Sequence, residues 1–254
     1  MHRLHGDKEF WLAGLRAEGA AFRAAATTAP PDVVVPGCPG WTVETLTAHL
    51  GSFYSWVRQH VERGVTEPPS AFADHRADVP AWPATLSWWD DEHLMLMSCL
   101  EPLDPTTPAW NWAPQAKKAG FWFRRTALDT AVHRWDLQSA TGAAQPIESK
   151  LAADGVSEIL DTWLPAGRRQ GPTDLNGVVH LVATDLAQEW YVRLRGEGIS
   201  LLDTDTILDT DDHHPRAHAA GAASDLLLSL FGRVPSRSLA VTGDASLLGA
   251  LHAG

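Results

Sequence analysis

Apolar residues recur every three or four positions in four long stretches of the first 142 residues, which is the spacing of amphipathic helices. The first stretch predicts a helix over residues 7–27. The second begins after Thr42, a good N-cap residue. The third covers residues 83–100, and the fourth covers residues 121–142. Because long Pro- and Gly-rich connections separate them, we expect these helices to form a four-helix bundle.

The pattern changes in the second half of the chain. One more helix is predicted over residues 147–164, and the polar, Gly/Pro-rich segment after it marks a domain boundary. We therefore expect one domain over residues 1–164 and another over residues 165–254. The second part mixes short strands with helices, so its predicted class is α+β around a small, mostly antiparallel sheet.

Its elements follow from turn signals and alternation. Residues 178–185 and 189–194 predict a hairpin, and residues 238–244 predict a further strand. Weaker strand candidates are Ile207–Leu208 and residues 217–222. Ser224 is expected to cap a helix that ends before Gly232. Residues 244–254 are expected to form a closing helix.

Composition limits the function. The formal charge of the 254 residues is -11, which argues against a nucleic-acid partner. No apolar run has the length of a membrane span, and the charged, amphipathic start does not predict a signal peptide. Two cysteines in so long a chain indicate a reducing compartment. We expect a cytoplasmic protein, a monomer or a homodimer, with no membrane partner.

The candidate chemistry lies in the fourth helix. Asp129 and His133 are four residues apart, so their side chains lie on one face. His49, on the flank of the apolar stripe of the second helix, is the third candidate. Packing these two helices along their stripes brings the three side chains together, and two imidazoles with one carboxylate suit zinc or another divalent first-row metal.

Alternatives remain open at this stage. The spacing of Asp129 and His133 also occurs on solvated helix faces and in simple Asp–His pairs. His93 is a rival ligand, although a histidine on an apolar row is more often a core residue. Asp136 either orients the ring of His133 or makes a local cap or salt bridge.

Four further residues are candidates for binding or catalysis. Trp110 and Trp112 either close the end of the bundle or form an aromatic wall beside the metal for a cofactor or substrate. Arg125, or its neighbour Arg124, either holds an anionic group or makes surface salt bridges. Arg233, after the last long apolar helix, is a candidate for a cleft between the two domains.

The chain resembles the mycothiol-dependent maleylpyruvate isomerase family, in the DinB-like metalloenzyme superfamily. The similar stretches include GCPGWTVETLTAHLG, WNWAPQAKKAGFWFRRTALDTAVHRWDLQSATG, GVVHLVATDLAQEWYVRL and ASDLLLSLFGRVPSRSLAVTGDASLL. The resemblance implies an N-terminal DinB-like bundle with a metal and a C-terminal α+β domain like that of sterol carrier proteins. It implies mycothiol as the thiol cosubstrate and places the His, Glu, His metal triad of the family on His49, Asp129 and His133. The middle residue here is Asp, one methylene shorter.

The resemblance implies a bound metal that activates the thiol of mycothiol for attack on an electrophilic small molecule. We favour an S-transferase, because such family members are numerous in one genome whereas maleylpyruvate metabolism needs one enzyme. A cis–trans isomerase of the maleylpyruvate type is the alternative with the same thiolate step. Two other classes remain: a metal-free bundle that binds an apolar small molecule, and a metal-dependent hydrolase that needs no thiol.

Overall fold

The computed structural model of the chain describes residues 6–70, 79–202 and 214–253. They form two compact units. Residues 6–112 and 116–145 make up a helical unit, and residues 113–115 with those from 146 onward make up a C-terminal unit. The sequence-based division after Leu164 stays a prediction. In the structure, the chain leaves the helical unit at residues 113–115, returns to it, and passes finally to the C-terminal unit between residues 145 and 146.

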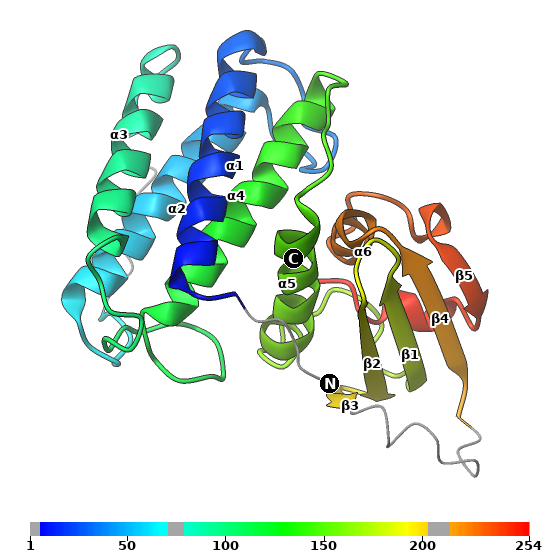
Figure 1. Ribbon diagram of the computed structural model, residues 1–254. Helices are drawn as coiled ribbons and strands as arrows, with labels where there is room; N and C mark the ends of the chain where they lie inside the picture. Colours follow the sequence, from blue (N-terminus) through cyan, green and yellow to red (C-terminus); the bar gives the residue numbers. More distant parts are fainter. Residues whose placement is uncertain (1–5, 71–78, 203–213, 254) are drawn as a thin grey trace. The chain divides into compact units, whose positions relative to one another are not determined.

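The helical unit is the predicted four-helix bundle (Figure 1). Its helices are α1 Lys8–Thr28, α2 Val43–Arg63, α3 Ala84–Leu100 and α4 Gly120–Ala140. The first residue of each helix lies within about three residues of the predicted start. The predicted fold class is confirmed.

Helices α1 and α2 begin where side chains accept hydrogen bonds from free backbone N–H groups. Asp7 caps α1, accepting a hydrogen bond from the backbone N–H of Phe10 at 2.9 Å. Thr42 and Thr45 exchange hydrogen bonds in a capping box at the start of α2. Gly64 ends α2 with φ of +61°, a left-handed conformation that favours glycine.

Helix α4 packs against both α1 and α2. Most of its side chains are buried. Polar groups inside are paired: the hydroxyls of Tyr54 and Thr130 lie 2.7 Å apart between α2 and α4. A helix surrounded in this way holds its side chains in fixed positions, which suits it to carry a site.

A buried ion pair joins α1 to α4. Arg134 Nε donates to Glu18 Oε2 at 2.6 Å and Arg134 Nη2 donates to Glu18 Oε1 at 3.2 Å. The second terminal nitrogen of Arg134 donates to Gln138 Oε1 at 2.9 Å and to the backbone carbonyl of Gln145. Since both charged side chains are at least nine-tenths buried, the stability of the bundle depends on their remaining paired.

The C-terminal unit is a five-stranded sheet with helices on one face (Figure 1). The strand order is β3-β2-β1-β4-β5, with β1 and β4 parallel and the other neighbours antiparallel. The strands are β1 Asn176–Ala183, β2 Gln188–Arg195, β3 Gly198–Leu202, β4 Arg216–Gly221 and β5 Ala240–Gly243. The helices are α5 Ser149–Glu158 (continued by a π-helical turn, Ile159–Trp163), α6 Ala223–Leu230, a 3-10 turn Ser236–Ser238 and α7 Ser246–Gly249.

Side chains alternate between the two faces of this sheet, as the period of a strand requires. Val179, Leu181 and Trp190 are buried on the helix-covered face, where Trp190 Nε1 donates to Ser157 Oγ of α5 at 2.9 Å. His180 and Tyr191 point to the other face and are partly exposed. The alternation predicted for the hairpin is therefore present.

Several details differ from the sequence-based expectations. Ser224 does not cap α6; it lies inside the helix, and its hydroxyl accepts a hydrogen bond from the backbone N–H of Ile147 at 3.0 Å. The closing helix is only the four residues of α7. Strand β3 was not predicted, since GISLL is short and has no alternating pattern. Ile207–Leu208 lies outside the described residues. No helix in the described ranges combines the length and apolar character needed to cross a membrane.

Candidate metal centre

The loop before α2 sets up one side of the candidate site. An isolated bridge between Val34 and Thr42 closes the loop, and the backbone N–H of Val35 donates to the carbonyl of Trp41 at 3.0 Å. Gly40 takes φ of +82° at the tip. The loop therefore delivers Cys38 and Trp41 next to the first turns of α2.

Three side chains from two helices converge there. Each of His49, Asp129 and His133 offers one ligand atom, and these atoms all lie within 4.8 Å of one another. His133 Nε2 is 3.8 Å from Asp129 Oδ2, one turn away on α4. The rings of His49 and His133 are 5.2 Å apart between centroids and nearly perpendicular. The structure thus brings together the three residues selected from the sequence; their role as metal ligands stays a prediction.

His133 is fixed from behind. Its Nδ1 lies 3.0 Å from Asp136 Oδ2, and the thiol of Cys38 donates to the same oxygen at 3.3 Å. Asp136 is fully buried. With Nδ1 held by this carboxylate, Nε2 is the ring atom left to face Asp129, as in histidine metal ligands oriented by a carboxylate. The sequence left this role of Asp136 open, and it gave no signal for Cys38.

The charges around the triad favour a cation. Burial would lower the pKa of His133, but the carboxylate of Asp129 and the hydrogen bonds with Asp136 and Cys38 outweigh it and raise this pKa to about 10. Burial would also raise the pKa of Asp129, but Arg125 and the two histidines lower it below its ordinary value. Asp129 is therefore ionised. Its negative charge, which favours a proton on His133, also favours a metal ion beside these two side chains.

Arg125 is paired with the candidate ligand rather than facing solvent. Its Nη2 donates to Asp129 Oδ1 at 2.8 Å, one turn earlier on α4, and the arginine side chain is only 3% exposed. Because one oxygen of Asp129 is held by Arg125, the other is the one directed toward His133. Arg125 thus makes a salt bridge, but a buried one rather than one at the surface, and its proposed catalytic role stays a prediction.

A pocket of about 340 Å³ opens beside His49. Its lining residues are Gly40, Trp41, Thr45, Ala48, His49 and Val79. The ring of Trp41 lies 4.6 Å from that of His49 and 6.3 Å from that of His133, between centroids. Trp41 is the aromatic residue next to the triad. Sequence reasoning missed it, although it belongs to the GCPGW stretch that carries the family resemblance.

Trp110 and Trp112 lie elsewhere in the helical unit. Trp110 packs on His60, 4.8 Å between ring centroids, and its carbonyl accepts a hydrogen bond from Trp122 Nε1 at 2.7 Å. Trp112 packs on Phe121. His60 is about three turns, or about 16 Å, along α2 from His49. The two tryptophans are therefore not brought to the triad within this unit, and their role in binding a cofactor stays a prediction.

The remaining candidates, His93 and Arg233, belong to none of the groups of possible metal ligands among the described residues. His93 stacks on Trp89 at 5.2 Å between centroids, and burial lowers its pKa. Two groups of residues in the described part of the chain could hold a metal ion, and His93 belongs to neither of them. It is therefore interpreted as a core histidine. Arg233 belongs to the C-terminal unit, where its Nη1 donates to the carbonyl of Phe231 at 3.0 Å. Its catalytic role stays a prediction.

A four-helix bundle whose facing helices present two imidazoles and a carboxylate has the architecture of a bundle metalloprotein. Comparison with known proteins gives the family. Residues 12–138 match the model of the mycothiol maleylpyruvate isomerase N-terminal domain, and these 127 residues are half of the 254 in the chain. The chain belongs to this family, which is named for an enzyme.

The fold agrees over almost the whole chain. A crystal structure of the mycothiol-dependent maleylpyruvate isomerase matches with a TM-score of 0.65 at 12% sequence identity, covering 93% of each chain. A histidine-to-alanine mutant of that isomerase matches with a TM-score of 0.66, the same identity and the same coverage. At this identity the likeness establishes the fold alone. A search of curated proteins found no match to this sequence.

Proposed function

We propose that the protein is a metal-dependent enzyme that activates mycothiol as a thiolate and transfers it to an electrophilic small molecule. The observation that carries the proposal is the convergence of His49, Asp129 and His133 within 4.8 Å beside a pocket of about 340 Å³. Membership of the family supports mycothiol as the thiol.

The donor set fits a divalent first-row metal. Two imidazole nitrogens and one carboxylate oxygen are ligands of catalytic zinc, and such sites leave at least one position open. A second donor group, Cys38, His133 and Asp136, shares His133 but is wholly buried. Of these two groups among the described residues, the first includes His49, which lines the pocket, and the second includes no lining residue. We therefore assign the ion to the first group, and its nitrogen and oxygen donors suit zinc.

The protein's own groups hold and orient the site. Arg125 fixes one oxygen of Asp129 and keeps the carboxylate ionised, while Asp136 fixes the ring of His133. A bound divalent ion supplies the positive charge that lowers the pKa of a thiol at its open position. The indole of Trp41 forms an apolar wall beside His49, which excludes water from the thiol sulfur.

In the transfer reaction, the thiolate sulfur attacks an electrophilic carbon and a C–S bond forms. The leaving group departs with its electron pair, or an epoxide opens and takes up a proton. Arg233 is our candidate for holding an anionic group of the second substrate, and Trp110 and Trp112 are our candidates for contacts with the cofactor.

Isomerisation is the second candidate reaction, and the family match favours it. In this case the thiolate adds to the double bond of an unsaturated acid, the carbon–carbon bond rotates, and elimination releases the thiol. Both reactions use the same first step.

Product analysis separates the two. We expect the zinc-loaded protein to consume an electrophile from a panel of epoxides, alkyl halides and unsaturated acids only when mycothiol is present. Mass spectrometry then shows a mycothiol adduct for transfer, or the mass of the substrate with the thiol recovered for isomerisation. Turnover of the panel without thiol contradicts the proposal and indicates a hydrolase. A folded protein that binds no metal contradicts it in favour of a binding protein.

Asp136→Asn is expected to weaken zinc binding by about 10- to 100-fold, because partners that orient metal-binding histidines contribute that much to metal affinity. The measurement is a chelator competition titration at neutral pH. Asp90→Asn is the matched control: it removes a carboxylate that pairs with Arg23 on the outer side of the bundle and is expected to leave the affinity unchanged. Equal affinities for wild type and Asp136→Asn would show that the carboxylate does not orient a ligand.

A further inference from the structure

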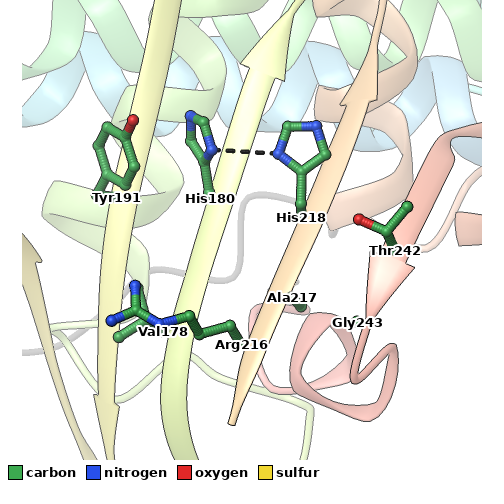
Figure 2. A pocket seen from close by; sticks show the side chains of 8 residues that line it. All are labelled: Val178, His180, Tyr191, Arg216, Ala217, His218, Thr242 and Gly243. Atoms are coloured by element: carbon green, nitrogen blue, oxygen red, sulfur yellow. Dashed lines mark hydrogen bonds between the residues drawn. The ribbon is translucent and has the colours of Figure 1, made fainter. Parts of the chain in front are cut away.

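Within the described part of the C-terminal unit, the face of the sheet opposite α5 carries a second group of histidines (Figure 2). His180 on β1 is directly opposite His218 on the parallel strand β4 and opposite Tyr191 on β2. Both histidines line a pocket of about 250 Å³, together with Val178, Tyr191, Arg216, Ala217, Thr242 and Gly243. The two imidazoles come from neighbouring strands, so the sheet itself sets their spacing.

His180 is held in one orientation. Its Nε2 lies 2.7 Å from Glu189 Oε2, and the hydroxyl of Tyr191 donates to the same oxygen at 3.1 Å. The ring of Tyr191 stacks on that of His180 with centroids 4.1 Å apart and planes 10° from parallel. Since a carboxylate only accepts hydrogen bonds, Nε2–H of His180 is the donor to Glu189. In the tautomer with this donor, Nδ1 has the lone pair.

That lone pair faces the second imidazole. His180 Nδ1 and His218 Nδ1 are 3.1 Å apart, the contact drawn as a dashed line in Figure 2. Two nitrogen ligands of tetrahedral zinc, each about 2.0–2.1 Å from the ion, are about 3.3–3.4 Å apart. The separation of the two nitrogens therefore has to grow by only about 0.3 Å, while the rings rotate so that both Nδ1 lone pairs point at one ion and no proton remains between them. In many metal sites the ring nitrogen of a histidine that does not bind the metal is hydrogen-bonded to a carboxylate. Glu189 is hydrogen-bonded to Nε2 of His180 in the same way.

We propose that His180 and His218 form a second metal site, on the C-terminal unit, for a divalent ion that prefers nitrogen ligands: zinc, nickel or copper rather than magnesium or calcium. The two imidazoles supply two ligand positions and leave the others open toward the pocket. Arg216 and Thr242 line that pocket, so a small anionic ligand or water suits the open positions. This site shares no residue with the triad of the bundle, and it does not depend on the proposed thiol chemistry.

The test uses Cu2+ as the probe and the full chain carrying His49→Ala, which disables the bundle site. Electron paramagnetic resonance counts the imidazole nitrogens on the copper, and a titration gives its affinity. We expect one equivalent with two coordinated imidazoles. Adding His180→Ala or His218→Ala is expected to lower the affinity at least tenfold and to remove the two-imidazole signal. Adding His214→Ala, an exposed histidine before β4 that does not line the pocket, is the control and is expected to change neither.

Glu189→Gln tests the role of the carboxylate that is hydrogen-bonded to Nε2 of His180. It keeps the shape of the side chain but removes the charge, and we expect a 10- to 100-fold loss of Cu2+ affinity. Circular dichroism checks the fold of each variant, and His218→Gln replaces His218→Ala if the alanine variant does not fold. The proposal is overturned if the His49→Ala protein binds no copper, or if the two-imidazole signal survives both histidine substitutions. In either case the pair is a hydrogen bond that stabilises the sheet.

Discussion

Replacing His49 by alanine is expected to reduce thiol-dependent turnover by about a thousandfold or more. His49 supplies one of the three converging ligand atoms and is the one that lines the pocket. A metal ion contributes several kcal/mol to stabilising developing charge, and every 1.4 kcal/mol is about a factor of ten in rate. Loss of the ion therefore costs about three powers of ten even if the substrates still bind.

The measurement is kcat/KM with mycothiol, combined with elemental analysis of the purified protein. Wild type is expected to contain about one equivalent of zinc at the bundle site, and His49→Ala to lose it. His214→Ala removes an exposed histidine of the C-terminal unit and is expected to retain both activity and bundle metal. A His49→Ala protein with unchanged kcat/KM would rule out the triad as the catalytic site.

Replacing Arg134 by methionine is expected to destabilise the bundle by about 3–5 kcal/mol, because it leaves a buried carboxylate without its partner. Methionine keeps much of the apolar volume of arginine, so the loss reports the charge rather than a cavity. Glu18 then has no counter-charge from the two hydrogen bonds that Arg134 makes with it. The bundle is the part affected, because the pair joins α1 to α4.

Urea denaturation followed by tryptophan fluorescence measures this loss, since ten of the twelve tryptophans lie in the helical unit. Arg16→Met is the matched control. Arg16 pairs with Glu101 on the surface, where both side chains are about half exposed, and such pairs contribute about 0.2–1 kcal/mol. The double variant Arg134→Met, Glu18→Leu is expected to regain most of the stability, because an apolar pair has no buried charge to compensate. A single variant as stable as the control would contradict this view of the pair.

The bundle was predictable because its helices are long and rich in regularly spaced apolar residues, and because α2 has a clear cap at Thr42. The convergence of the triad followed from the four-residue spacing of Asp129 and His133 and from the place of His49 beside its own apolar stripe. Periodicity places residues on a helix face, so it succeeds wherever a side chain belongs to a long helix.

The same reasoning fails for loops. Trp110 and Trp112 lie in a Pro-rich connection, and no periodic pattern shows which end of the bundle they reach. Trp41 was missed for the same reason, since only the folded loop before α2 brings its ring to His49. The pair His180 and His218 depends on the register of two strands that are far apart in sequence, and register is set by tertiary contacts.

Optical spectroscopy of the cobalt-substituted protein tests the central claim most directly, because Co2+ takes nitrogen and oxygen ligands like zinc and has visible absorption that reports its ligands. Adding mycothiol to the Co2+-loaded wild type is expected to produce a sulfur-to-metal charge-transfer band, which is absent from His49→Ala treated in the same way. Wild-type protein that shows no such band, or a band of equal strength in His49→Ala, would contradict the activation of a thiol by an ion held between His49, Asp129 and His133.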